Sequence, residues 1–508
     1  MFSKLHSMGV WGISAYTVEV ETNLSGGLPA FDVVGLPDMS VRESRDRVRS
    51  AMKNSGYDFP VSRITVNLAP ADIKKEGSVY DLPIMLGIMQ ASGMIASDCS
   101  DAVFAGELSL SGEVRPIKGL LSMAIAAKKN GFRRMFVPAH IAAQAAVVGG
   151  IDVYPVDNVN MLIAHLNGKA QIEKVCAPDV SFENVGGEYP DFADVAGQAY
   201  AKRALEVAAA GGHNVLLIGP PGSGKSMLAK RLPSILPDMT FEEAIETTSV
   251  YSVAGELKNG ETLIKTRPFR SPHHTVSAAA LSGGGTVPSP GEISLAHNGV
   301  LFLDELPEFS KSAMETLRQP LEDGVVHISR VSGTLSYPCS TMFVAAMNPC
   351  PCGYFGHPTR QCVCSENAVS RYLNRVSGPM LDRMDLHVEV PPVEFDELSS
   401  AKPSECSADI RKRVNAAREI QKKRYAGTGV SCNARLTTSM LKEYCVLESD
   451  AKDFLKASFE RLSMSGRAYD RILKVARTIA DLDSSEKIGK THIAQAVRYR
   501  SLDRKYWH

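Results

Sequence analysis

Hydrophobic and polar positions alternate with two different periods along the first third of the chain. Short β-rich runs are followed by stretches in which apolar residues recur with helical spacing. The predicted strands cover residues 16–21, 63–68 and 135–138, and the predicted helices cover residues 41–55 and 82–92. This alternation predicts an α/β domain over residues 1–167.

The apolar pattern fades between residues 168 and 190, where charges mix with Pro178 and Gly187, and such a composition is typical of a linker. Beyond Pro190 the pattern returns in a regular order. It predicts helix 198–210, strand 214–218, a glycine-rich turn, helix 225–232 and strand 300–303. Strands that alternate with helices in this way predict a parallel sheet covered by helices. We expect this second domain over residues 191–394.

Strand signals nearly vanish after Pro391-Pro392. Helical periodicity covers residues 407–425, 437–460 and 466–482, so a helical domain is expected over residues 395–508. The whole chain is therefore predicted to be an α/β multidomain protein.

The composition places few limits on function. Lys plus Arg and Asp plus Glu each number 56 among 508 residues, so no net charge would by itself attract nucleic acid. The N-terminus lacks the apolar core of a signal peptide, and no stretch reaches the roughly 18 apolar residues that span a bilayer. We therefore expect a cytoplasmic protein without membrane contact.

A phosphate-binding loop is the clearest chemical signal. It lies between the apolar run 215–218 and a helical pattern, and it satisfies G-x-x-x-x-G-K-[ST]. Its residues are Gly219, Pro220, Pro221, Gly222, Ser223, Gly224, Lys225 and Ser226. We expect backbone N–H groups to surround the phosphates of ATP, Lys225 to reach the β- and γ-phosphates, and Ser226 to ligate Mg²⁺. A chance glycine-rich turn, the alternative, does not account for the flanking strand and helix.

The apolar strand 300–303 ends in two carboxylates. Because a central strand can deliver a carboxylate beside the magnesium ion, Asp304 is a candidate Mg²⁺ ligand. Glu305 is a candidate general base that would polarise the attacking water, which predicts a hydrolase. The alternative is an acidic N-cap of the next helix.

Several motifs together resemble AAA+ ATPases. They are the phosphate loop, the Leu-Phe-Leu-Asp-Glu strand, and Met347-Asn348-Pro349 after a further strand. More narrowly, residues 267–274 (Arg-Pro-Phe-Arg-Ser-Pro-His-His) and 377–385 (Ser-Gly-Pro-Met-Leu-Asp-Arg-Met-Asp) resemble the YifB/ComM family of the magnesium-chelatase-like branch. The resemblance spans nearly the whole chain.

This resemblance implies further roles. Asn348 would sense the γ-phosphate, and Arg383 would be an arginine finger that reaches a neighbouring subunit's nucleotide. Arg467 would be a lid arginine that acts within its own subunit, with Arg471 as a substitute. Any one arginine considered alone would more often make a surface salt bridge. Because a finger acts between subunits, the resemblance implies assembly, and AAA+ relatives form hexameric rings.

Residues 106–120 and 135–138 resemble the proteolytic domain of Lon protease. Lon-type cleavage needs a serine nucleophile and a lysine general base. Matched to that pattern, the serine position holds Val79 and the lysine position holds Leu121, while Ser78 and Lys118 are displaced along the chain. We therefore expect a Lon-like fold without peptidase activity.

Four of the ten cysteines form two C-x-C pairs. They are Cys350, Cys352, Cys362 and Cys364. Four thiolates at this spacing suit a structural, tetrahedral zinc ion, with His357 as an alternative to one sulfur. Four reduced thiols or a redox pair are the other interpretations. Because the cysteine loop 350–364 directly follows Asn348-Pro349, a metal would fix an insertion next to the ATP sensor.

Candidate DNA contacts follow from the same resemblance. In the related branch the interval between residues 225 and 304 holds a hairpin that faces the ring pore, which makes Arg267 and Arg270 candidates. A second hairpin is predicted at residues 325–337, with Arg330 near its tip. Arginines in a pore would follow phosphates without reading bases.

Two other features carry weaker signals. The adjacent His273-His274 pair is a poor metal site, because neighbouring residues of a strand point to opposite faces. The basic run in helix 407–425 is more typical of a solvated face than of a DNA contact.

The leading function comes from the resemblance: a ring-shaped, ATP-hydrolysing DNA helicase that promotes branch migration in homologous recombination and natural transformation. The alternative is a chelatase-type remodelling ATPase that acts on a protein partner. The Lon-like domain and the cysteine loop count against it, since neither belongs to the ordinary chelatase motor subunit. Val79 and Leu121 disfavour a third class, an ATP-dependent protease.

Overall fold

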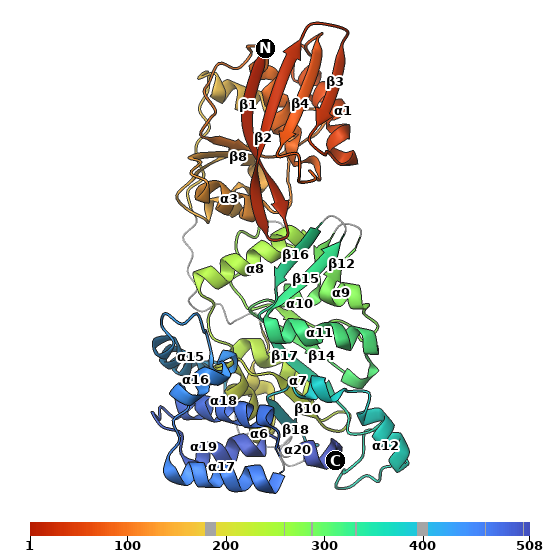
Figure 1. The fold of residues 1–508 in the computed structure, drawn as a ribbon, viewed down its shortest axis with the longest axis vertical. Coiled ribbons are helices and arrows are strands. Elements are labelled where there is room, and N and C mark those ends of the chain that lie inside the picture. The colour runs from red at the N-terminus through yellow and green to blue at the C-terminus, as the bar shows by residue number, and fades with distance from the viewer. Residues whose placement is uncertain are drawn as a thin grey trace. The chain divides into compact units, whose positions relative to one another are not determined.

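The computed structural model describes residues 1–177, 189–258, 260–285, 288–330, 333–393, 405–462, 464–500 and 502–507. The chain divides into two compact units (Figure 1). The first contains Met1–Ser181 with two later segments, Ala244–Ile264 and Ser329–Tyr337. The second contains Phe182–Glu243, Lys265–Ile328 and Pro338–His508.

A mixed seven-stranded sheet of order β3-β4-β2-β1-β5-β8-β9 forms the core of the first unit. Its strands are β1 (Phe2–Trp11), β2 (Ser14–Ser25), β3 (Ala30–Val34), β4 (Arg63–Ala69), β5 (Ala102–Phe104), β8 (Arg134–Pro138) and β9 (Asp152–Val156). The two longest strands, β1 and β2, pair antiparallel around a tight turn in which Gly12 has a φ of +63°. Along β4, buried residues alternate with more exposed ones, because one face of the strand packs in the core.

The helices of the first unit are α1 (Met39–Asn54), α2 (Asp81–Ala91), α3 (Leu120–Lys129), α4 (Ala142–Ala146) and α5 (Val159–Leu166). The helix α2 is buried along almost its whole length and packs against β1, β2 and α1. A small hairpin, β6 (Glu107–Leu108) with β7 (Val114–Arg115), completes this part. Each strand and helix predicted for this region falls on an observed element.

A parallel sheet of order β11-β14-β17-β10-β18 forms the core of the second unit. Its strands are β11 (Phe269–Arg270), β14 (Val300–Leu303), β17 (Met342–Met347), β10 (Val215–Ile218) and β18 (Leu386–Glu389). All residues of β10, β14 and β17 are buried. Continuous apolar strands of this kind are buried on both faces, which explains why their sequences do not alternate. The predicted parallel sheet is confirmed.

Helices and two hairpins precede or connect these strands along the chain, and residues 244–254 of one helix belong to the first unit. The helices are α6 (Ala199–Gly211), α7 (Lys225–Arg231), α8 (Phe241–Ala254), α9 (Ala278–Ser282), α10 (Glu292–Leu295), α11 (Lys311–Asp323), α12 (Glu366–Leu373) and α13 (Gly378–Leu381). The hairpins are β12 (Gly283–Gly284) with β13 (Ser289–Pro290), and β15 (Val325–Arg330) with β16 (Gly333–Pro338). The second hairpin matches the one predicted at residues 325–337, and the end of this hairpin belongs to the first unit.

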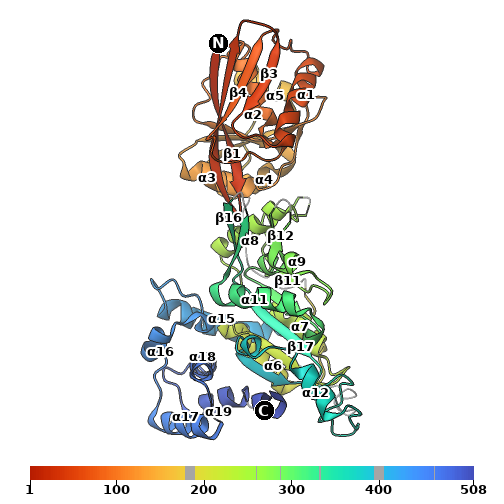
Figure 2. The ribbon, with the colours of Figure 1, turned by 45° about the vertical axis from the view of Figure 1, so that its right-hand side comes forward.

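The C-terminal helices are α15 (Ser407–Arg424), α16 (Thr438–Tyr444), α17 (Ser449–Leu462), α18 (Gly466–Leu482), α19 (Lys490–Arg498) and α20 (Leu502–Trp507). Both α15 and α18 pack against α6, and their apolar residues share one core with the parallel sheet. Figure 2 shows α15 to α19 on one side of this sheet and α12 on the other. Among the described residues, no helix is long and apolar enough to cross a membrane.

The single helix predicted over residues 437–460 is wrong, because the chain leaves the helix between α16 and α17. Leu447 forms a parallel bridge with Ile488, and the Ile488 N–H donates to the Val446 carbonyl at 2.9 Å. This tertiary pairing replaces the helical hydrogen bonds that the local sequence favours.

Candidate functional site

The phosphate loop joins the buried strand β10 to the N-terminus of α7. Gly222 and Gly224 have φ angles of +77° and +93°, a region that glycine adopts at little cost. A Cβ atom on Gly219 would overlap the Val390 carbonyl of the neighbouring chain segment. The glycines therefore allow the tight loop that turns its backbone towards a ligand at the helix N-terminus.

Lys225 is nearly buried, and backbone and amide oxygens surround its ammonium group. Its Nζ donates to the carbonyls of Gly219 and Pro220 at 2.8 and 2.9 Å, and to Asn348 Oδ1 at 3.2 Å. Burial lowers the pKa of Lys225 to about 8, although the charges of Asp304 and Glu305 oppose the shift. A buried cation whose direct partners are neutral oxygens is well suited to bind an anion.

A second buried group in the loop also points to a ligand. Within the described part of the chain, the buried hydroxyl of Ser223 has no hydrogen-bond partner. Together with Lys225 and the positive end of α7, this hydroxyl fits the phosphates of ATP.

Ser226 and Asp304 meet at the same end of the sheet. Ser226 Oγ donates to Asp304 Oδ2 at 2.5 Å, and Asp304 directly follows β14. Hard oxygen ligands of this kind are the ones that Mg²⁺ prefers, so this pair fits a magnesium ion bound with the nucleotide.

Glu305, the next residue, is 57% exposed and has a φ of +52°. Its carboxylate lies 3.8 Å from His274 Nδ1. The side chain is therefore accessible to a water molecule, as a general base must be.

A basic cavity of about 490 Å³ lies at the opposite end of the sheet, where the strands begin. Asn214, Thr341 and Asp385 contribute to its lining, and these residues directly precede β10, β17 and β18. The phosphate loop, Asp304 and Asn348 instead follow β10, β14 and β17. Because β10 has four residues, the two ends of the sheet are separated by roughly 13 Å.

Five basic side chains and two acidic ones also line this cavity. They are Arg383, Arg435, Arg467, Arg471 and Lys474, with Glu322 and Asp385. Arg383 is held by Glu322 and by the carbonyls of Arg318 and Pro379. Five basic side chains against two acidic ones give this cavity an excess of positive charge, which favours an anion.

Arg467 lies 3.5 Å from Asp382, the residue that precedes Arg383, and its side chain is 67% exposed. Arg471 lies 3.8 Å from the same carboxylate and 3.4 Å from Asp385. Arg467 therefore lies at the end of the sheet that is remote from the phosphate loop. This placement does not agree with the expectation that Arg467 serves the nucleotide of its own subunit.

A buried network fixes the position of Asp385. His213 Nδ1 lies 3.3 Å from Asp385 Oδ2, and His213 Nε2 lies 2.8 Å from the Thr478 hydroxyl of α18. Burial raises the pKa of Asp385, but the hydrogen bond and charge of His213, together with Arg471, outweigh burial and lower it to about 2. Sequence reasoning missed His213, Arg435 and Lys474, since no motif contains them and only the tertiary fold brings them here.

The three arginines predicted to contact DNA differ in their surroundings. Arg267 is 12% exposed, and its guanidinium donates to Glu243 at 2.7 Å and to the carbonyls of Pro237 and Asn298. Arg270 makes a bidentate pair with Glu292 at 2.7 and 2.8 Å. These contacts favour structural roles for Arg267 and Arg270. The side chain of Arg330 lies outside the described residues.

The basic run on α15 is largely occupied by ion pairs. Arg411 pairs with Asp238, Arg413 with Glu206, and Arg424 with Asp481. These pairs tie α15 to the rest of the second unit.

The four clustered cysteines converge on one point, and their sulfur atoms all lie within 4.8 Å of one another. All ten cysteines of the chain lie in the described residues, and none forms a disulfide. The cluster can therefore hold a metal ion.

In the first unit, Val79 and Leu121 are both buried in the core. The nearby hydroxyl of Ser78 donates to a carboxylate oxygen of Glu107. Neither position that matches the Lon serine-lysine pair carries a nucleophile or a base.

Three family models of magnesium-chelatase subunits match the chain. The model "Magnesium chelatase, subunit ChlI" matches residues 191–398. The models "Subunit ChlI of Mg-chelatase" and "Magnesium chelatase, subunit ChlI C-terminal" match residues 20–141 and 404–500.

Several relatives match over nearly their full length. The YifB protein of Salmonella typhimurium is 44% identical over 99% of this chain and 98% of its own. The competence protein ComM of Haemophilus influenzae is 45% identical over 98% of this chain and 97% of its own. A magnesium-chelatase 67 kDa subunit of Chlorobaculum parvum is 29% identical over 31% of this chain and 23% of its own. The chain therefore belongs to the YifB/ComM family of magnesium-chelatase-like AAA+ proteins.

Proposed function

We propose that the chain is the subunit of a ring-forming motor that hydrolyses ATP and moves branched DNA. One observation supports the ring: the phosphate loop lies where the strands of the parallel sheet end, and the arginine cavity lies where they begin. A single subunit then cannot bring both to one nucleotide. Head-to-tail contacts between identical subunits would join them and would close into a ring, with a hexamer as the expected state.

Within one subunit, Lys225 would bind the β- and γ-phosphates, and Ser226 and Asp304 would hold Mg²⁺. The magnesium ion, when bound, neutralises charge that develops on the phosphate oxygens. Glu305 would accept a proton from the attacking water, and Asn348 would orient that water. The 3.2 Å contact between Asn348 Oδ1 and Lys225 Nζ supports a shared role for the two groups.

The neighbouring subunit would supply Arg383 and Arg467 together. Both side chains line the same cavity, so the placement supports a shared role for them across the interface, with Arg471 and Asp385 as supporting residues. Arginines that stabilise the charge of phosphoryl transfer are worth about 10³ to 10⁵ in rate.

DNA enters the proposal through the 45% identity to a competence protein and not through the contacts of a particular side chain. Branch migration during recombination and natural transformation is the activity that the resemblance implies. Of the three arginines first considered, Arg330 at the end of β15 is the DNA contact that we retain. Arg267 and Arg270 are engaged in ion pairs.

The remaining parts of the chain have proposed roles that fit this motor. Residues 1–167 would form a Lon-like domain without peptidase activity, joined by a linker at 168–190 to an ATPase core at 191–394. Residues 395–508 would form the helical domain that carries Arg467. The expected cofactors are ATP with Mg²⁺, and Zn²⁺ at the cysteine loop.

A chelatase-type remodelling ATPase that acts on a protein partner is the alternative. The identity to a magnesium-chelatase subunit covers 31% of this chain, against nearly all of it for ComM. This difference favours the DNA motor.

ATP hydrolysis by the purified chain, measured with and without a four-way DNA junction, tests the proposal. The junction should stimulate hydrolysis and its branch point should move, and Lys225→Ala should abolish both. Lys230→Ala, an exposed position on the same helix, is the matched control and should change neither. Hydrolysis that DNA does not stimulate, with no branch movement, would reject the DNA motor in favour of the remodelling ATPase.

A further inference from the structure

We propose that the four-cysteine loop binds one zinc ion, and that the zinc-bound loop holds the phosphate loop in the shape that binds ATP. This inference rests on the ATP site of the proposed function and deepens it, since it makes nucleotide affinity depend on the metal.

The sulfur positions match a tetrahedral site for one ion. Cys350 Sγ lies 3.4 Å from Cys352 Sγ and 3.7 Å from Cys362 Sγ, and the last two sulfur atoms are 3.6 Å apart. A tetrahedron with zinc–sulfur bonds of about 2.3 Å has edges of about 3.8 Å. A disulfide would need about 2.05 Å between two sulfur atoms. The arrangement therefore fits a single thiophilic ion better than it fits a redox pair.

Backbone amides around the sulfur atoms support thiolate ligands. The Phe355 N–H donates to Cys350 Sγ at 3.3 Å, and the amides of Tyr354 and Val363 hydrogen-bond to Cys352. Such outer hydrogen bonds orient metal ligands and stabilise their charge.

His357 is not part of this cluster. Its Nδ1 accepts from the amides of Thr359 and Arg360 at 3.1 and 3.0 Å, so it serves the backbone of the loop. Four sulfur ligands leave no open position, which indicates a structural ion and not a catalytic one.

The cysteine loop touches the phosphate loop directly at Gly353. This residue follows Cys352 and has a φ of +83°. A Cβ atom at position 353 would lie 2.7 Å from Pro221 Cγ and would overlap Pro221 Cδ, so the backbone of one loop lies against a side chain of the other.

A second connection runs through the start of the cysteine loop. Cys350 is fully buried and stands two residues after Asn348, whose amide oxygen accepts from Lys225. The ion would therefore fix a segment that meets the ATP site both at Pro221 and at Lys225.

Loss of the metal would release these constraints. The four thiols would no longer cross-link the two ends of the loop, and the segment around Gly353 would sample other positions. If the phosphate loop then kept its binding shape for about a tenth of the time, the apparent Kd for ATP would rise about tenfold.

Metal content and nucleotide affinity of the full chain test this proposal without any DNA. We expect about one zinc ion per chain by elemental analysis. Removing it with a thiophilic chelator under reducing conditions, followed by dialysis into excess Mg²⁺, should weaken binding of a fluorescent ATP analogue about tenfold. Adding zinc back should restore the affinity, which a chain that had merely unfolded would not allow.

Two variants separate the contact from the metal. Gly353→Ala should retain zinc yet weaken the ATP analogue, because the new methyl group displaces Pro221. Gly427→Ala is the matched control: it has a similar φ of +79° but no neighbouring atom within 4 Å, so it should change neither quantity. Cys352→Ser combined with Cys362→Ser should lose zinc and reproduce the chelated protein.

Each contrary result has a distinct meaning. A chain that neither contains nor takes up a metal overturns the site, and iron in place of zinc overturns the identity of the ion. Zinc that can be removed and restored without any change in ATP affinity overturns the link to the phosphate loop. A zinc-loaded chain that fails to bind ATP refutes the motor itself, and one that binds ATP but ignores DNA refutes only its DNA function.

Discussion

Lys225 shows how one buried charge depends on what occupies its site. Burial lowers the pKa of this lysine to about 8. In the free protein the ammonium therefore loses its proton as pH rises through about 8, whereas bound phosphates would keep it protonated. Because the complex then holds one proton more than the free protein, ATP affinity should fall about tenfold per pH unit above that point.

Titrations of a fluorescent ATP analogue between about pH 7 and pH 10 measure this effect, since the window follows from the lowered pKa. Lys225→Arg provides the control: a guanidinium keeps its charge over the whole range, so its affinity should be independent of pH. An unchanged affinity of the native chain above pH 8 would contradict the assignment of Lys225 as the phosphate ligand.

Arg267 illustrates a residue whose motif suggests function and whose contacts indicate support. Burial lowers the pKa of its guanidinium, while Glu243 opposes that shift. Removing the charge in Arg267→Ala leaves Glu243 and several carbonyls without their donor. We expect the free energy of unfolding to fall by about 2 to 3 kcal/mol.

Urea unfolding measures that loss, and Arg270→Ala should cost less, because the Arg270 side chain is 25% exposed against 12% for Arg267. DNA affinity of the folded Arg267→Ala protein should stay near that of the native chain. A selective loss of DNA binding at full stability would restore Arg267 as a DNA contact.

At the scale of single residues, the sequence predicts what is local. The phosphate loop lies within eight consecutive residues, and in the structure Lys225 contacts Asn348 and Ser226 contacts Asp304. The position of Arg467 could not be predicted from the sequence, because it depends on which end of the sheet the C-terminal helices cover.

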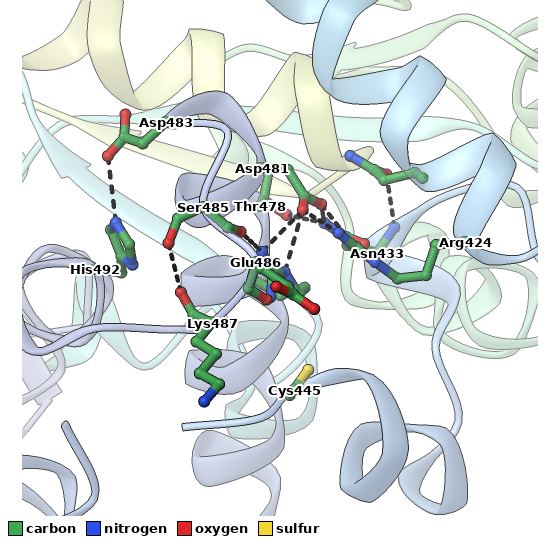
Figure 3. Close-up of polar contacts among 12 residues, drawn as sticks. Arg424, Asn433, Cys445, Thr478, Asp481, Asp483, Ser485, Glu486, Lys487 and His492 are labelled. Carbon is green, nitrogen blue, oxygen red and sulfur yellow. Dashed lines mark hydrogen bonds and ion pairs between the residues drawn. The ribbon is translucent and has the colours of Figure 1, made fainter. Parts of the chain in front are cut away.

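In the C-terminal region, α15, α18 and the segment at Asn433 meet at one buried carboxylate (Figure 3). Asp481 of α18 accepts from Arg424 of α15 at 2.6 and 3.0 Å, from Arg477 at 3.1 Å and from Asn433 at 2.8 Å. The Asp481 side chain is 0% exposed. Asp481→Ala would leave two arginines without their shared partner, so we expect a loss of about 3 to 5 kcal/mol in the free energy of unfolding.

Thermal and urea unfolding of the variant test this expectation. Asp483→Ala is the matched control, since that carboxylate is 48% exposed and pairs with His492 and Arg203 at the surface, as Figure 3 shows for His492. Its effect should stay below about 1 kcal/mol. Equal losses in the two variants would argue against a special role for the buried site.

Element prediction succeeded where periodicity alone decides and failed where a tertiary contact competes. The helix 466–482 coincides with α18, and its serine N-cap at position 465 marks the start locally. The break between α16 and α17 has no glycine or proline to announce it. It exists because residues 446–448 pair with Ile488, about forty residues later.

At the scale of the whole molecule, the phosphate loop and the arginine cavity lie at opposite ends of the sheet. This geometry predicts which mixtures of inactive subunits recover activity. Arg383→Ala alone should lower ATP hydrolysis by about 10³-fold. When Arg383→Ala subunits are mixed with Lys225→Ala subunits, hydrolysis should return. About a quarter of the interfaces then combine an intact phosphate loop with an intact arginine cavity.

The decisive mixture combines Arg383→Ala with Arg467→Ala. If both arginines act on the neighbour's nucleotide, the arginine cavity at every interface lacks one of them, and the mixture should stay inactive. If Arg467 served its own subunit, some interfaces would be complete and hydrolysis would return. ATPase assays of subunits mixed at equal concentration, with Lys225→Ala plus Arg383→Ala as the positive control for exchange, distinguish the two outcomes. Recovery in the mixture of Arg383→Ala with Arg467→Ala would show that these two arginines do not act on the same nucleotide.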